Sequence, residues 1–196
     1  RCPAVTTHHL TLSRRRADVD IWDRSPAIVP VMLIREERED DLVAIAEVTA
    51  SAFADLAHSD QTEPKILDRL RAAGALAISL VAIEADALIG HVAFSPVTIS
   101  GFQNRWFGLG PVSVHPRHQR RGVGSALIRR GIEQLRSRDA AGCVVLGDPA
   151  YYCRFGFEHD PGLRFEGAPP EYFMRLNLTA AEPPTGTVEY APAFTP

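Results

Sequence analysis

The segment 112–125 has the clearest chemical meaning in this sequence. It reads Val-Ser-Val-His-Pro-Arg-His-Gln-Arg-Arg-Gly-Val-Gly-Ser, so an apolar run and a polar turn precede Gly122 and Gly124. Glycines at a helix start let backbone N–H groups surround an anion, and the unpaired N–H groups and the dipole of the first turn attract it. Arg120 and Arg121 could add charge-assisted hydrogen bonds. The spacing predicts a phosphate-binding turn.

Features that the turn lacks narrow the class of ligand. No Gly-Lys-Ser/Thr ending is present, which excludes a P-loop for ATP. The pair Gly122 and Gly124 has neither the third glycine nor the upstream pattern of a dinucleotide-binding fingerprint. The alternative interpretation is a glycine turn that only starts a helix, with exposed arginines.

Three helices are expected around this turn. Asp40 and Asp41 precede a helical spacing of apolar residues that ends near Phe53, and a second helix opens at Thr62 and stops near Gly74. A longer helix is expected from Gly122 to about Arg138. Its apolar side comprises Val123, Leu127, Ile128, Ile132 and Leu135.

The remaining apolar runs indicate strands. A first strand is expected to begin at Met32, and three runs separated by short turns favour an antiparallel meander. The expected strands of the meander are Ala77–Glu84, Leu88–Ile99 and Trp106–Val114. Cys143–Leu146 indicates a buried strand after the long helix, which gives a β-α-β unit. A helical turn at Tyr151–Phe155, a strand at Tyr172–Leu178 and an edge strand within Thr187–Phe194 follow. The pattern predicts an α/β (α+β) fold.

The glycine turn resembles the acyl-CoA-binding motif of the GCN5-related N-acetyltransferase (GNAT) superfamily. That motif, Gln/Arg-x-x-Gly-x-Gly/Ala, is matched by Gln119, Gly122 and Gly124 directly after the strand that ends at Val114. The order of the expected elements is also that of the superfamily, so the resemblance covers roughly residues 32–178. It implies a mixed, centrally splayed β-sheet flanked by helices.

A second segment, 146–157, resembles the superfamily's late motif. It reads Leu-Gly-Asp-Pro-Ala-Tyr-Tyr-Cys-Arg-Phe-Gly-Phe and is similar to the YhbS-type branch of predicted N-acetyltransferases. The family tyrosine four residues before Gly156 corresponds to Tyr152, whose hydroxyl would protonate the departing thiolate. The alternative is a packing role for Tyr152. Tyr151 is out of register with the motif.

The resemblance implies acetyl-CoA as co-substrate and direct attack on its thioester by a bound neutral amine. The pantetheine arm would pair with the open edge of the strand that ends at Val114, and the pyrophosphate would bind the N–H groups of the turn. The implied cofactor-binding residues are Val112, Ser113, Val114, Gln119, Arg120, Arg121, Gly122, Val123, Gly124 and Ser125. The acceptor is expected to be a small-molecule amine or a peptide amine. The alternative is a non-catalytic CoA-binding or regulatory module of the same fold.

A general base is harder to assign. Some superfamily members carry a glutamate on the strand before the turn, but 106–114 contains no acidic residue. Glu84, His91 and Asp148 are expected near the cleft, although each residue type more often has a surface or structural role. A water chain, or an amine of low pKa, would need no base.

Two further clusters give no site. His115 and His118 have a His-x-x-His spacing, but Pro116 breaks any helix that would turn both toward a metal, and no third ligand is close in sequence. No metal is therefore expected. Cys153 with His159 could be imagined as an activated nucleophile, yet direct transfer from the thioester makes such a residue unnecessary.

Length and composition limit the other classes of function. The 196 residues suit one domain, expected at 31–180, with an N-terminal arm at 1–30 and a C-terminal extension at 181–196. A net charge of −3 argues against nucleic-acid binding, despite the arginine run 14–16 in the arm. No apolar stretch approaches the roughly 18 residues that span a membrane.

Three cysteines without a paired spacing favour the cytoplasm. A homodimer is an open alternative to a monomer.

Overall fold

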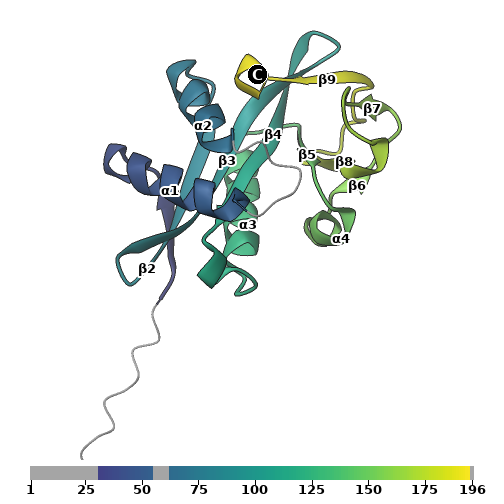
Figure 1. The fold of residues 1–196 in the computed structure, drawn as a ribbon. Helices are drawn as coiled ribbons and strands as arrows, with labels where there is room; N and C mark the ends of the chain where they lie inside the picture. The colour runs from purple at the N-terminus through teal and green to yellow at the C-terminus, as the bar shows by residue number, and fades with distance from the viewer. Residues whose placement is uncertain (1–30, 55–61, 195–196) are drawn as a thin grey trace, which may run out of the picture.

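Residues 31–54 and 62–194 are described by the computed structural model, and they build a nine-stranded mixed sheet with helices on both faces (Figure 1). The strands are β1 (Leu33–Glu36), β2 (Ile78–Glu84), β3 (Ala87–Ile99), β4 (Phe102–Val114), β5 (Gly142–Leu146), β6 (Glu158–His159), β7 (Leu163–Arg164), β8 (Phe173–Asn177) and β9 (Gly186–Tyr190). The helices are α1 (Leu42–Phe53), α2 (Glu63–Ala72), α3 (Val123–Ser137) and α4 (Pro149–Tyr152). Five 3-10 turns are η1 (Glu39–Asp41), η2 (Pro116–His118), η3 (Cys153–Phe155), η4 (Pro170–Tyr172) and η5 (Pro192–Phe194). The fold class expected from the sequence is confirmed.

The main sheet has the order β1-β2-β3-β4-β5-β8-β6, and β9 pairs with both β3 and β7. Strands β2 to β4 form the expected antiparallel meander, and β1 pairs antiparallel with β2. Strand β5 is parallel to β4, and α3 connects the two, which confirms the β-α-β unit. This crossover brings the start of α3 to the end of β4 that later forms the candidate site.

Strands β4 and β5 part halfway along the sheet. They pair from Trp106 with Gly142 to Leu109 with Val145, and the remaining residues of β4 pair only with β3. At the parting point β4 also bulges, because Phe94 of β3 pairs with Leu109 while Val92 pairs with Val112. Pro111 lies in this bulge, and a proline has no N–H to donate to a ladder. The edge of β4 is therefore open beyond Leu109.

Because side chains alternate along the strands, both faces of the sheet contribute apolar residues to the core. On one face, Leu80 and Phe94 pack against α3, whose predicted apolar side is buried throughout. On the other face, Val81 packs with Ile45 of α1 and Leu67 of α2. A third cluster joins Trp106 and Val144 to β7, β8 and β9. Both faces are covered, so the sheet holds α1, α3 and β4 rigidly in relation to one another.

The later elements differ in detail from the predicted ranges. The expected helical turn at Tyr151–Phe155 begins earlier, because Asp148 caps the amide of Ala150 and starts α4 at Pro149. Strands β6 and β7 have two residues each and left no periodic signal. The N-terminal arm lies outside the described residues. In the described ranges, no helix has the length and apolarity of a membrane-crossing segment.

Candidate active site

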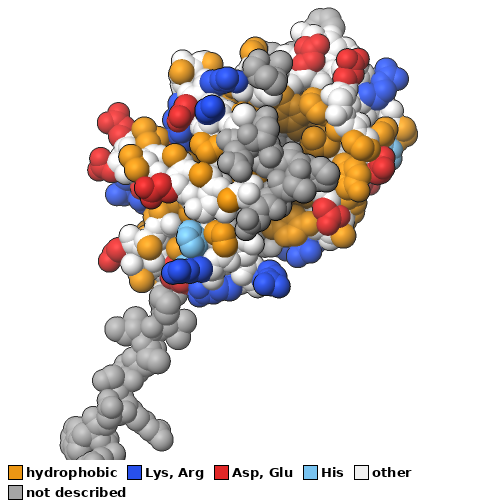
Figure 2. Space-filling model, viewed as in Figure 1, with side chains coloured by type: hydrophobic (Ala, Val, Ile, Leu, Met, Phe, Trp, Pro, Cys, Tyr) orange, Lys and Arg blue, Asp and Glu red, His pale blue; other side chains and the backbone are white. Residues whose placement is uncertain are grey.

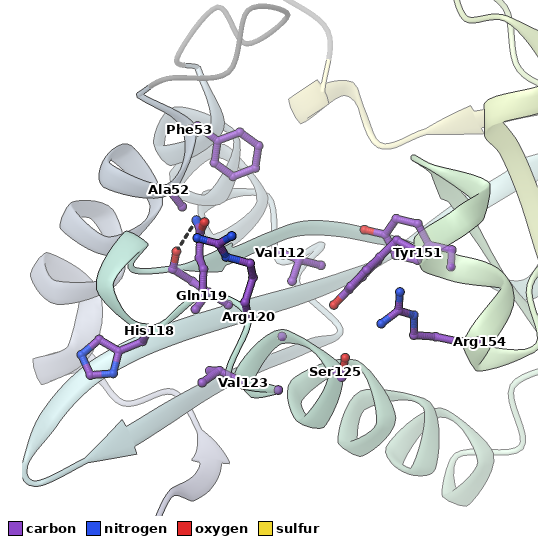
Figure 3. Close-up of a pocket in the computed structure, with 14 residues that line it drawn as sticks. Ala52, Phe53, Val112, His118, Gln119, Arg120, Val123, Ser125, Tyr151 and Arg154 are labelled. Atoms are coloured by element: carbon purple, nitrogen blue, oxygen red, sulfur yellow. Dashed lines mark hydrogen bonds between the residues drawn. The ribbon is translucent and has the colours of Figure 1, made fainter.

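A pocket of about 720 Å³ lies where the start of α3 meets the open end of β4, the C-terminal end of α1 and helix α4 (Figure 3). Its lining residues are Ala52, Phe53, Val112, Val114, His118, Gln119, Arg120, Gly122, Val123, Gly124, Ser125, Tyr151, Tyr152 and Arg154. The two motifs singled out in the sequence, 21 or more positions apart, thus face the same pocket.

The glycine turn enters α3 through two left-handed residues. Arg120 has φ +59° and Gly122, the N-cap of the helix, has φ +87°. The first backbone bond of α3 runs from the N–H of Ala126 to the carbonyl of Gly122, at 2.9 Å. The N–H groups at positions 123–125 precede that bond, so no carbonyl of the helix pairs with them. Together with the helix dipole they form an anion-binding end directed at the pocket.

Gly124 faces the opposite wall of the pocket. A Cβ at this position would lie 3.1 Å from the hydroxyl oxygen of Tyr151 and 3.4 Å from Val114. The turn therefore has room for a ligand beside its backbone but little room for a side chain of its own.

The open end of β4 contributes Val112 and Val114 to the wall. The side-chain amide of Gln119 donates a hydrogen bond to the carbonyl of Val114, at 3.1 Å, which is the dashed line in Figure 3. This bond ties the loop that precedes α3 back onto the strand. The motif glutamine thus also has a structural partner.

The structure does not bring two of the expected cofactor residues to the pocket wall. Ser113 is fully buried and its hydroxyl lies 3.1 Å from the hydroxyl of Thr49 in α1, on the other face of the sheet. Arg121 is ion-paired with Glu84, at 3.1 Å, and is absent from the lining. The backbone of both residues still belongs to the strand and the turn that border the pocket.

Basic groups dominate the polar part of this wall. Arg120 and His118 lie on the α3 side, and Arg154 reaches in from η3 with its guanidinium carbon 4.6 Å from the centre of the Tyr151 ring. None of the described lining residues is a carboxylate. On the face drawn in Figure 2, basic side chains gather along the lower edge, where Figure 1 places the loop before α3. The pocket suits an anionic ligand.

Sequence reasoning missed several lining residues. Ala52 and Phe53 come from α1, about 70 positions before the glycine turn, and no local pattern places that helix end at the pocket. Arg154 lies inside the late motif, so its position two residues after Tyr152 was an available signal. His118 was considered only as a metal ligand.

Tyr152 lines the pocket and lies in an aromatic cluster. Its ring centre is 5.0 Å from that of Tyr151 and 6.0 Å from that of Phe157, both in edge-on contacts. Burial raises the pKa of Tyr152 above its ordinary value, and Tyr151 and Cys143 add to the shift. The phenol therefore keeps its proton at neutral pH, as a proton donor must.

The three candidate bases all have structural partners. Glu84 holds Arg121, and Asp148 accepts the amide of Ala150, at 2.9 Å. His91 is fully buried, with its Nε2 2.7 Å from the hydroxyl of Ser79. Burial lowers the pKa of His91, although Glu37 opposes this. None of the three lines the pocket.

Metal ligands and a reactive cysteine give no competing site. Among the described residues, no group of three or more His, Cys, Asp or Glu side chains could hold a metal ion. Cys153 is exposed and unpaired, and it does not line the pocket. The amides of the turn, the open strand and Tyr152 remain as the groups around which chemistry can be built.

Comparison with known proteins agrees with this geometry. The family model for the acetyltransferase (GNAT) domain matches residues 33–159, and the chain belongs to this family. It is 36% identical over 169 residues to the uncharacterized N-acetyltransferase YhbS of Escherichia coli, covering 83% of this chain and 98% of that protein. The uncharacterized N-acetyltransferase YjhQ of the same organism is 34% identical over 151 residues, which is 72% of this chain and 82% of YjhQ.

Two solved structures resemble the chain closely. A GNAT family acetyltransferase from Brucella melitensis, in complex with acetyl-CoA, is 47% identical with a TM-score of 0.75, covering 84% of this chain and 98% of that one. YhbS from Escherichia coli, in complex with CoA, is 33% identical with a TM-score of 0.79, covering 85% and 93% of the two chains. Both relatives bind the cofactor that the resemblance implied for this chain.

Proposed function

We propose that this chain transfers the acetyl group of acetyl-CoA to a primary amine by direct attack in a ternary complex. The observation that carries the proposal is that the free N–H groups of α3 and the open end of β4 meet Tyr152 in one and the same pocket. An amide cradle alone would suit any phosphate ligand. The unpaired strand beside it suits a ligand with an extended amide-containing arm, which is what pantetheine is.

The chemistry of the wall supports a position for the cofactor. Its pyrophosphate binds the N–H groups at positions 123–125, with Arg120 and Arg154 as nearby cations. Its pantetheine arm runs along Val112 and Val114 as an added strand. This direction brings the thioester toward the point where β4 and β5 part, beside Tyr152.

The reaction then needs one bond made and one broken. The amine nitrogen attacks the thioester carbonyl carbon, and a backbone N–H near Val112 stabilises the oxyanion. The carbon–sulfur bond breaks, and the CoA thiolate takes the proton of the Tyr152 hydroxyl, which solvent restores. The amine gives its own proton to water, because none of the described lining residues is a carboxylate.

The acceptor that we propose is a small-molecule amine or a peptide amine, and the setting is the cytoplasm. Buried Cys143 and exposed Cys153 are both unpaired, as in a reducing compartment. The catalytic domain is proposed to span residues 31–180.

Two measurements test the function. CoA at about 100 times its dissociation constant should stabilise the fold by roughly 2.7 kcal/mol and raise the melting temperature by about 5 to 10 °C. Free thiol release from acetyl-CoA over a panel of amines, amino acids, polyamines and peptides, with mass spectrometry of the product, should then identify an acceptor. Binding without thiol release would favour the non-catalytic CoA-binding module, and no binding would overturn both.

A further inference from the structure

One carboxylate connects the hairpin between β2 and β3 with the loop that precedes α3. Glu84 Oε1 lies 3.1 Å from Arg121 Nη2, and Glu84 Oε2 lies 3.4 Å from His118 Nδ1. Arg121 Nη1 lies 3.0 Å from the same nitrogen of His118, which can accept this donor only while it is not itself donating to Glu84. The Glu84 side chain is only 15% exposed, while that of Arg121 is 50% exposed. The three groups form a closed cluster, with the acid on its sheltered side.

Glu84 is itself held by a tight hairpin. It is the last residue of β2 and pairs with Ala87, the first residue of β3. The two residues between them, Ala85 and Asp86, have φ +48° and +62°. Two left-handed residues in succession are typical of a two-residue hairpin turn whose twist matches its strands. The carboxylate therefore projects from a fixed element toward the loop that precedes α3.

The loop needs such support because its backbone is strained. Arg121 stands between Arg120, at φ +59°, and Gly122, at φ +87°. A left-handed arginine persists only where its surroundings fix it. Among the described contacts, the guanidinium of Arg121 meets only the cluster with Glu84 and His118. Glu84 thus anchors the middle residue of the turn whose amides face the pocket.

The basic side chains of the loop point in two directions. His118 and Arg120 line the pocket, whereas Arg121 is turned outward to Glu84. Glu84 holds Arg121 away from the pocket wall without lining the pocket itself.

We propose that Glu84 is a positioning residue for CoA binding, which orders the 118–122 loop through Arg121 and His118. The inference rests on the proposed function, since CoA is the ligand whose pyrophosphate the loop would receive. It goes beyond that function in assigning a role to a residue outside the pocket.

The test separates binding from chemistry. Glu84→Gln keeps the size of the side chain and removes its charge, so the Kd of CoA and the KM of acetyl-CoA should rise about three- to tenfold. The kcat at saturating acetyl-CoA should stay within about twofold. Glu133→Gln is the matched control: it removes an equal charge from the outer face of α3, where Glu133 pairs with Arg130, at 3.3 Å.

A double-mutant cycle tests the route through Arg121. Arg121→Ala should weaken CoA binding, and adding Glu84→Gln should weaken it little further, because the two variants break the same contact. Additive losses would show that Glu84 does not act through Arg121 and would overturn the inference. A fall in kcat with loss of a limb of the pH–rate profile would instead make Glu84 the general base.

Hydrogen exchange of the ligand-free protein distinguishes this inference from the proposed function. Amides 118–122 should exchange faster in Glu84→Gln than in the parent or in Glu133→Gln. Unchanged exchange and unchanged Kd, in a protein that binds CoA, would overturn the inference alone. A parent protein that does not bind CoA would overturn the proposed function, and with it the ligand assigned to the loop.

Discussion

The ring of Tyr152 covers Gly147 so closely that a Cβ on Gly147 would overlap with its Cε2. Gly147 directly follows β5, so the absent side chain is what lets the aromatic ring pack over the end of that strand. The position of the phenol is thereby fixed by the backbone of the sheet rather than by a flexible loop. For the role as proton donor that we propose for Tyr152, this packing would preorganise the hydroxyl.

Removing the Tyr152 hydroxyl should separate binding from turnover. Tyr152→Phe keeps the ring over Gly147 and deletes the donor. The Kd of CoA should therefore stay unchanged, while kcat should fall by roughly ten- to a thousandfold. Because burial raises the pKa of Tyr152, this hydroxyl should produce no loss of activity near neutral pH in the parent.

Steady-state kinetics with the best acceptor, together with calorimetry of CoA binding, check this prediction. Tyr172→Phe serves as the control, since Tyr172 is 44% exposed and does not line the pocket. An unchanged kcat in Tyr152→Phe would make Tyr152 a packing residue, with water delivering the proton.

A side chain at Gly124 should abolish CoA binding. Glutamate there adds bulk where a Cβ already meets the Tyr151 hydroxyl at 3.1 Å, and it places negative charge at the anion-binding end of α3. The rise in melting temperature with CoA should disappear in Gly124→Glu. Ser137→Glu, at the other end of the same helix, should retain it. A persistent shift in Gly124→Glu would remove the glycine turn from the cofactor site.

Buried His91 should make the fold sensitive to mild acid. Burial lowers its pKa, so between the unfolded value near 6.5 and the lower folded value the unfolded chain binds the additional proton. The contribution of neutral His91 to stability is therefore lost progressively as the pH falls below about 6.5. Glu37, whose pKa is also lowered, adds its own loss only at more acidic pH.

Thermal unfolding at pH 7.5 and 5.5 measures this effect. The fall in Tm between the two values should be smaller in His91→Gln than in the parent, because glutamine can still hydrogen-bond Ser79 and does not titrate. His159→Gln, which removes an exposed histidine from β6, should behave like the parent. Equal falls in all three proteins would assign the acid sensitivity to other groups.

The N-terminal arm should be dispensable. Deletion of residues 1–30 should leave the thermal stability and the turnover of acetyl-CoA nearly unchanged, because the segment lacks the periodic apolar residues that dock an element onto a core. Tm and thiol release compared with the full chain provide the measurement. Loss of folded protein would show that the arm is structural.

Local patterns were sufficient for the elements that carry the glycine turn. The spacing of Val123, Leu127 and Ile132 predicted the buried face of α3, and the motif glycines located its start. Alternation along β4 also contained an unused signal: Val112 and Val114 share one face, so the Ser113 side chain had to face the other.

The features that the sequence could not predict depend on contacts between residues that are far apart in the chain. Arg121 pairs with Glu84, 37 residues earlier, and nothing near either residue indicates the contact. The approach of Phe53 to the pocket depends on how α1 packs across the sheet. The parting of β4 and β5 was expected only through resemblance, because a strand pairing that stops early leaves no mark on hydrophobic periodicity.

The pairing of β9 has a consequence for self-association. Strand β2 covers β3 only as far as Phe94, and β9 takes over that side of β3 from Val97 to Ile99. Without β9, this end of β3 would present unpaired backbone N–H and C=O groups on an open strand, which is a template for a strand of another chain. A chain shortened before Gly186 would thus be prone to aggregate, even with every residue of the proposed active site intact.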